Sequence, residues 1–202
     1  MSHNPVEKKF SILCEIVRAQ HFAWREAVQE LCPGVDPAEV VARMWEITGH
    51  KTASAYLKRI NASGQLAVKV ARSIVWSSES MGEHAVVETP EVADPEQRTS
   101  GGRRKDEAFV RHLECPWFRW DERQQLLAED RPGCDVWFQT IVSDINKSLG
   151  TKLRVETKSV TTYHNTGHAT AAAIALSSGS PGETGWDSPA RTHGLEASWI
   201  RR

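Results

Sequence analysis

The sequence predicts an α+β protein in which an N-terminal helical bundle packs against a small antiparallel sheet with helices. Two observations carry this prediction. In the N-terminal half, apolar residues recur every three or four positions through three segments, which is typical of helices. Beyond a polar, turn-rich stretch, the C-terminal half combines further helical periodicity with segments of branched or very small residues, which are typical of strands.

The first two predicted helices span residues 6–31 and 37–60. The apolar stripe of the first consists of Phe10, Leu13, Val17, Trp24, Val28 and Leu31. The second begins with a capping residue, a first-turn proline and a capping-box glutamate, namely Asp36, Pro37 and Glu39. Because the connection at Pro33-Gly34 is short, we expect the two helices to pack as an antiparallel pair with Trp24 in the core.

A third predicted helix runs from Leu66 to about Trp76, so residues 1–88 form a helical N-terminal subdomain. Residues 89–105 are polar and non-periodic, which predicts a linker or mobile loop. Residues 106–176 form the predicted α+β domain. Residues 177–202 are rich in Ser, Gly and Pro, and we expect a weakly ordered tail there.

The α+β domain begins with a predicted strand, Ala108 to Leu113, that leads into Cys115-Pro116-Trp117. Helices follow at about 117–129 and 134–148, separated by Arg131-Pro132-Gly133. The second helix carries a stripe with Cys134 near its centre, and Gly150 is its stop signal. Two strands, 152–162 and 169–176, complete the predicted sheet.

Composition and charge exclude several classes of partner. The formal net charge is -1 and the basic residues are spread along the chain, so we expect no nucleic-acid or anionic-membrane partner. No apolar run is long enough to span a bilayer and the N-terminus lacks a signal-peptide pattern, which predicts a cytoplasmic protein. The four cysteines have no short repeated spacing, so we expect free thiols and no CxxC zinc knuckle.

Cys115 is the leading candidate for chemistry. It stands at a strand-to-helix junction, where a helix N-terminus lowers the pKa of a thiol and makes it a nucleophile or a metal ligand. His168, beside Gly167, is the expected proton shuttle, and Asp144, at the border of an apolar stripe, is a candidate general acid or base. Each has a structural alternative: a small buried hydrophobe, a turn histidine and a solvated carboxylate, respectively.

Two further groups are candidate ligand contacts. Glu46 and His50 lie four apart on one helix, and with His84 they are possible ligands for a divalent metal such as zinc, although such a pair is commonly a surface hydrogen bond. Arg154 and Lys158 share one strand face and are suited to hold a carboxylate, unless that face is simply solvated. Trp117 and Trp137 are candidate walls for a substrate, because Trp is common where a core meets a polar cavity.

Residues 108–176 resemble the C-terminal part of the L-2-amino-thiazoline-4-carboxylic acid hydrolase-like family. The resemblance lies in Cys115-Pro116-Trp117, the Gly133-Cys134 start of a helix carrying Asp144, the strand 153–159 and Gly167-His168. It implies hydrolytic opening of a small cyclic C–N substrate, with Cys115 as nucleophile. A more distant likeness to 4-vinyl reductase domains implies a small-molecule-binding module in which cysteines can hold zinc.

The sequence therefore predicts a cytoplasmic hydrolase that opens a small amidine, imide or thiazoline-type ring through a cysteine-centred site. The expected partner is a small-molecule substrate that is a carboxylic acid, and homo-oligomerisation is left open. No cofactor is expected unless a divalent metal such as zinc is bound. Two alternatives remain: a non-catalytic small-molecule-binding module and a metal-dependent enzyme that uses Glu46 and His50.

Overall fold

The computed structural model describes residues 5–89, 106–160 and 171–177, and it confirms the α+β class. The described elements are α1 (Pro5–Leu31), α2 (Pro37–Leu57), α3 (Leu66–Ser80), β1 (His84–Glu88), β2 (Glu107–Glu114), α4 (Pro116–Gln124), α5 (Leu127–Leu149), β3 (Arg154–Val160) and β4 (Ala171–Ser177). The predicted tail lies outside the described residues except for its first residue, Ser177, which ends β4, and so does the predicted linker except for its first residue, Thr89. No helix in the described ranges is long and apolar enough to cross a bilayer.

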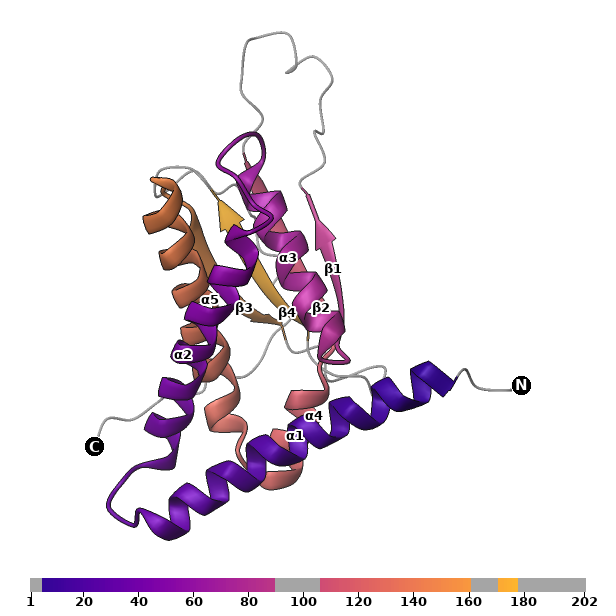
Figure 1. The fold of residues 1–202 in the computed structure, drawn as a ribbon, viewed down its shortest axis with the longest axis vertical. Coiled ribbons are helices and arrows are strands. Elements are labelled where there is room, and N and C mark those ends of the chain that lie inside the picture. Colours follow the sequence, from indigo (N-terminus) through magenta and orange to yellow (C-terminus); the bar gives the residue numbers. More distant parts are fainter. Residues whose placement is uncertain (1–4, 90–105, 161–170, 178–202) are drawn as a thin grey trace, which may run out of the picture.

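The four strands form one antiparallel sheet in the order β1-β2-β4-β3. Val110 of β2 stands opposite Ile174 of β4, which in turn stands opposite Thr157 of β3. β1 belongs to the segment 1–88 that the sequence assigns to helices, yet it pairs with β2 as an edge strand of the sheet. α3 lies over β1 and β2, α5 contacts β3, and α2 packs on α5 (Figure 1).

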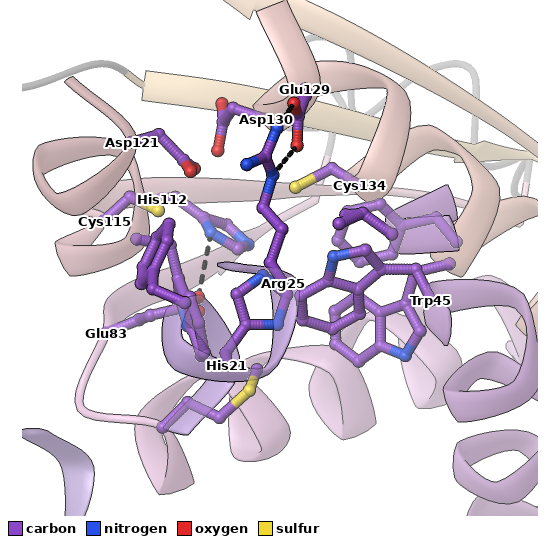
Figure 2. Close-up of a pocket in the computed structure, with 16 residues that line it drawn as sticks. His21, Arg25, Trp45, Glu83, His112, Cys115, Asp121, Glu129, Asp130 and Cys134 are labelled. Carbon is purple, nitrogen blue, oxygen red and sulfur yellow. Dashed lines mark hydrogen bonds and ion pairs between the residues drawn. The ribbon is translucent and has the colours of Figure 1, made fainter. Parts of the chain in front are cut away.

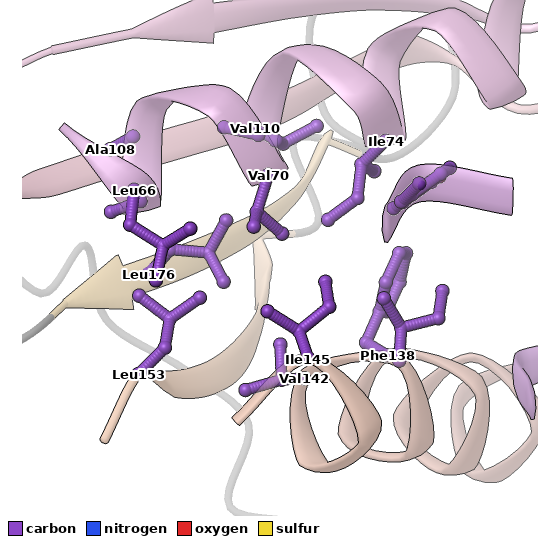
Figure 3. Packing of buried hydrophobic residues seen from close by; sticks show 14 of the residues in the cluster. Leu66, Val70, Ile74, Ala108, Val110, Phe138, Val142, Ile145, Leu153 and Leu176 are labelled. Atoms are coloured by element: carbon purple, nitrogen blue, oxygen red, sulfur yellow. The ribbon is translucent and has the colours of Figure 1, made fainter. Parts of the chain in front are cut away.

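The core lies between the sheet, α3 and α5 (Figure 3). Leu66, Val70 and Ile74 recur every four residues and therefore form one face of α3. They pack with buried residues of the strands and of α5, among them Ala108, Val110, Phe138, Ile145 and Leu176. One hydrophobic cluster thus joins residues from both sides of the predicted linker.

The predicted break between the last two helices is wrong. The chain turns at Gln125, whose φ of 62° is left-handed, and α5 then begins at Leu127 and continues through Pro132. Proline inside a helix removes one backbone hydrogen bond. The next residue, Gly133, packs directly against Trp45 of α2.

The predicted pairing of the first two helices is also wrong. α1 crosses the lower end of the molecule and diverges from α2, whose main partner is α5 (Figure 1). The buried face of α1 consists of Cys14, Arg18 and Phe22, whereas Trp24 is 40 % exposed. A short connection fixes only where two helices meet, and their crossing angle is set by what each one packs against.

α2 and α5 approach each other closely at glycines. A Cβ atom on Gly49 would lie 2.8 Å from Cβ of Thr140 and 3.1 Å from the carbonyl oxygen of Trp137. A Cβ atom on Gly133 would lie 2.8 Å from Cδ1 of Trp45. All three separations are shorter than van der Waals contact. The spacing of the two helices therefore depends on the absence of a side chain at Gly49 and Gly133.

We expect Gly49→Ala to destabilise the protein by about 1 kcal/mol or more, because the steric cost of a forced contact in a packed interface exceeds the gain of roughly 1 kcal/mol in helix propensity. Chemical denaturation measures the change. Gly34→Ala is the matched control, since nothing lies within 4 Å of a Cβ atom there. Equal stability of the Gly49 variant and the wild type would contradict this account of helix spacing.

Candidate functional site

A small, partly open cavity lies where α1, α2, β2, α4 and α5 converge (Figure 2). Its volume is about 50 Å³, and it is lined by aromatic, acidic, basic and thiol side chains. Among the residues that line it are His21, Phe22, Arg25, Trp45, Glu83, His112, Cys115, Trp117, Asp121, Glu129, Asp130, Cys134, Trp137 and Phe138.

Cys115 is the residue that caps α4, in an extended conformation before Pro116. Burial of the thiol and the negative charge of Glu83 raise its pKa to about 12, although the backbone N–H groups of Phe118 and Trp117 act in the opposite direction. The sequence led us to expect a lowered thiol pKa at this helix N-terminus. Burial outweighs that effect, so Cys115 carries its proton at neutral pH.

His112 and Glu83 form a buried pair next to Cys115. His112 stands three residues before Cys115 on β2, on the inward face that Ala108 and Val110 also occupy. Its Nδ1 lies 3.2 Å from Oε2 of Glu83, and the two side chains are 9 % and 5 % exposed. His112 Nε2 is buried without a hydrogen-bond partner. Figure 2 shows His112 and Cys115 at the same end of the cavity, with Trp45 at the other.

Asp121 of α4 and Asp130 of α5 meet on the cavity wall. Burial, the charge of Asp130 and the hydrogen bond between the two carboxyls raise the pKa of Asp121 to about 8. The pKa of Asp130 is also raised, chiefly by burial. Two carboxyl groups in contact cannot both ionise cheaply, so the pair holds a shared proton at neutral pH.

An ion pair between Arg25 of α1 and Glu129 of α5 holds α1 next to the cavity. The Arg25 guanidinium donates from Nε to Oε2 of Glu129 at 2.8 Å and makes a second contact to the other carboxylate oxygen. These side chains are 14 % and 15 % exposed, so the pair is largely shielded from water. One turn earlier, the His21 ring packs 5.4 Å from Trp117 between ring centres, and burial lowers its pKa, which keeps it neutral.

Indole rings form part of the cavity wall. The centre of the Trp45 ring lies 5.9 Å from that of Trp117 and 5.8 Å from that of Trp137. Cys134 lies on the same helix as Trp137 and also lines the cavity. Burial, followed by the charge of Asp130, raises the pKa of Cys134 well above its usual value, so this second thiol is also protonated.

The structure brings together three of the site residues that the sequence predicted, namely Cys115, Trp117 and Trp137. It does not bring Asp144 to them, because the Asp144 carboxylate binds Nδ1 of His50 at 2.6 Å on the α2–α5 surface. Arg154 is exposed on β3 and lies outside the cavity lining. His168 and the side chain of Lys158 lie outside the described residues.

The predicted metal ligands do not converge. Glu46 binds Arg43 on the surface of α2, His50 binds Asp144, and His84 is exposed at the start of β1. In the part of the chain that the structure describes, no group of three or more His, Cys, Asp or Glu side chains is arranged to hold a metal ion. Glu46, His50 and His84 therefore do not form the zinc site that their residue types suggested.

Several cavity residues were missed by the sequence analysis. Strand alternation from Ala108 through Val110 would have placed His112 on the buried face. The four-residue spacing of Asp130 and Cys134 would have placed them on one face of a helix. Arg25 and Glu83 have no comparable local signal, since their partners are distant in the sequence.

Comparisons with known proteins add no match: no protein-family model, no curated protein and no solved structure matches this chain. The resemblance of residues 108–176 to the thiazoline carboxylic acid hydrolase-like family therefore stays a prediction.

The Asp121–Asp130 pair makes a testable contribution to stability. An unfolded aspartate has a pKa near 3.8, whereas that of folded Asp121 is about 8. Between these values the folded protein keeps a proton that the unfolded chain has released, so stability falls as pH rises through this window. We expect the free energy of unfolding of Asp121→Asn to be close to that of the wild type at the acidic end of this window. Towards the alkaline end the variant should become more stable relative to the wild type.

Chemical denaturation across this pH range measures the difference. Asp135→Asn is the control, because Asp135 lies on the same helix as Asp130 but pairs with Arg131 near the surface. A stability difference between Asp121→Asn and the wild type that does not change with pH would contradict the shared proton.

Proposed function

We propose that this protein is a hydrolase that opens a small cyclic C–N substrate of the amidine, imide or thiazoline type, with Cys115 as the nucleophile. The observation that carries the proposal is the buried His112–Glu83 pair in the same cavity lining as Cys115. A thiol, an imidazole with a free nitrogen and a carboxylate that orients the imidazole form the arrangement by which cysteine hydrolases activate sulfur.

The raised pKa of the Cys115 thiol means that a base is needed, and His112 is that base. Because Cys115 is protonated at neutral pH, it needs a base before it can attack. Nε2 of His112 has no partner and accepts the proton from sulfur, while Glu83 holds the opposite nitrogen in its protonated form. The sulfur then attacks the electrophilic ring carbon. His112 takes the place that the sequence analysis gave to His168.

The leaving nitrogen also needs a proton. When the ring C–N bond breaks, the nitrogen takes up the proton that Nε2 of His112 received from the Cys115 sulfur, which leaves His112 neutral again. Water then hydrolyses the bond between carbon and the Cys115 sulfur, with His112 as the base, and the thiol is restored. The indole rings of the cavity wall, of which Trp137 is buried, reduce the access of bulk water during these steps.

The rival proposal is a module that binds a small molecule without reacting with it. The raised pKa of both cavity thiols favours this alternative, since a protonated, buried cysteine is unreactive on its own. The two proposals differ in one respect that can be measured: only a hydrolase loses turnover when Cys115 or His112 is replaced while the ligand still binds.

For the catalytic prediction, we expect Cys115→Ser to abolish turnover of a panel of small cyclic amidines, imides and thiazolines, assayed by NMR. His112→Asn should lower the rate by about a hundredfold or more, because it removes the base. Cys32→Ser is the matched control, since Cys32 is an exposed free cysteine. Wild-type turnover by the Cys115 variant, or a loss in His168→Ala that exceeds the loss in His112→Asn, would contradict the assignment.

Alkylation tests the state of the thiol independently of any substrate. We expect iodoacetamide to modify exposed Cys32 first at neutral pH and to leave Cys115 largely unmodified, because the thiolate is the reactive form and burial suppresses it. Peptide mass spectrometry on the folded protein reports both sites. Faster labelling of Cys115 than of Cys32 would mean that its thiolate is stabilised, and that His112 is not needed as a base.

A further inference from the structure

The cavity has an excess of acidic groups. Its lining contains four carboxylates, Glu83, Asp121, Glu129 and Asp130, and among the described lining residues Arg25 is the only arginine or lysine. Arg25 is committed to Glu129 by two contacts. The charge of Arg25 also acts on Asp121 and opposes the rise of its pKa, but Glu83, Asp121 and Asp130 form no ion pair with an arginine or lysine of the described lining.

The aromatic walls favour the same kind of ligand. The Trp45 ring lies against both Trp117 and Trp137 in the cavity wall, and Phe22 and Phe138 contribute two further rings. The face of an aromatic ring is the negative part of its quadrupole and attracts a cation. Rings and carboxylates thus create a negative potential in one small volume, which opposes entry of the carboxylate ligand that the sequence analysis expected.

Three buried polar atoms of the lining lack a hydrogen-bond partner, namely Nε2 of His112, Oε2 of Glu83 and Nε1 of Trp117. As whole residues His112 is 7 % and Glu83 is 9 % exposed, and Oε2 of Glu83 makes only the ion-pair contact with Nδ1 of His112 at 3.2 Å. With the proton of His112 on Nδ1, Nε2 of His112 and Oε2 of Glu83 are acceptors, whereas Nε1 of Trp117 is a donor. Buried polar atoms are normally satisfied, so a ligand that supplies N–H donors fits this end of the cavity.

The cavity volume limits the size of the group that enters. A water molecule needs roughly 10–15 Å³ of such space, so about 50 Å³ accommodates roughly four non-hydrogen atoms. Amidinium and guanidinium groups have this size, are planar, and carry several N–H donors around one positive charge.

We propose that the cavity recognises its ligand through a small planar cation of the amidinium or guanidinium class, which Asp121 and Asp130 hold against the indole rings. The proposal rests on the proposed function in one respect, since the central carbon of this cation is the electrophile that Cys115 attacks. It names the charge of the group that is recognised, which the proposed function leaves open.

Binding exchanges a cation for a proton. The shared proton of the Asp121–Asp130 pair leaves to solvent as the cation enters, so the affinity rises with pH up to about 8 and levels off above it. The gain is at most about tenfold per pH unit, because one proton is released. The titratable and charged groups that face the pair are His21, Arg25, Glu83, His112, Cys115, Glu129 and Cys134.

The test uses the full chain and simple probes. Acetamidinium and guanidinium are titrated against it by NMR and by calorimetry in two buffers of different ionisation enthalpy, with acetamide and urea as neutral isosteres and acetate as the anion. We expect millimolar binding of the two cations with release of one proton, and no binding of the isosteres or of acetate.

Variants locate the site. We expect Asp121→Asn and Asp130→Asn each to weaken cation binding at least tenfold, whereas Asp135→Asn leaves it unchanged. Thermal melting establishes that each variant is folded, and two independent variants keep the test valid if one is not. The proposal would be overturned if acetate bound instead of the cations or if no probe bound. It would also be overturned if Asp121→Asn and Asp130→Asn both bound the cations as tightly as the wild type does.

A failure of this proposal can be told apart from a failure of the proposed function. If Cys115→Ser binds acetamidinium like the wild type and only the wild type turns over a ring substrate, both proposals stand. If the cations bind but no ring is opened by the wild type, recognition stands and the hydrolase proposal fails. If a ring is opened while only acetate binds, catalysis stands and cation recognition fails.

Discussion

The close approach of α2 and α5 is the constraint on which the rest of the structure depends. Gly49 and Gly133 leave no room for a Cβ atom, so the two helices lie nearer than ordinary side chains allow. Trp45 fits over Gly133, and Trp137 donates from Nε1 to Oγ1 of Thr52 at 3.3 Å. Both indole rings are thereby held at the edge of the cavity, and α5 brings Asp130 and Cys134 to the same place.

The cavity concentrates groups that are costly to bury. Four carboxylates lie beside two thiols and several aromatic rings, and the protein limits the cost in two ways. Arg25 neutralises Glu129 from another helix, and Asp121 and Asp130 reduce their joint charge by keeping a proton. Such arrangements lower stability, so a fold that retains one is expected to use it.

Polar contacts hold α1 in place at two points. Arg25 binds Glu129, and Arg18 donates from Nη1 to the backbone oxygen of Met81 at 3.0 Å. Beside that contact, Cys14 packs against Gly82, whose φ of 77° is left-handed and whose missing side chain leaves room for the helix. The apolar stripe that first identified α1 as a helix faces outward instead, which explains why periodicity located the helix correctly and misjudged its buried face.

The sequence by itself determined the fold class and the course of most elements, because caps, glycines and apolar periodicity are local signals. Gly150, with a left-handed φ of 65°, ends α5 as its position predicted. Cys115, Trp117 and Trp137 were recognised from their residue types and setting. The tertiary structure alone decided that α5 passes through Pro132, that α1 packs through Arg18 and Phe22, and that His112 and Glu83 are the neighbours of Cys115. These outcomes depend on contacts between segments far apart in the chain, where packing outweighs local preference and burial sets the charge of each group.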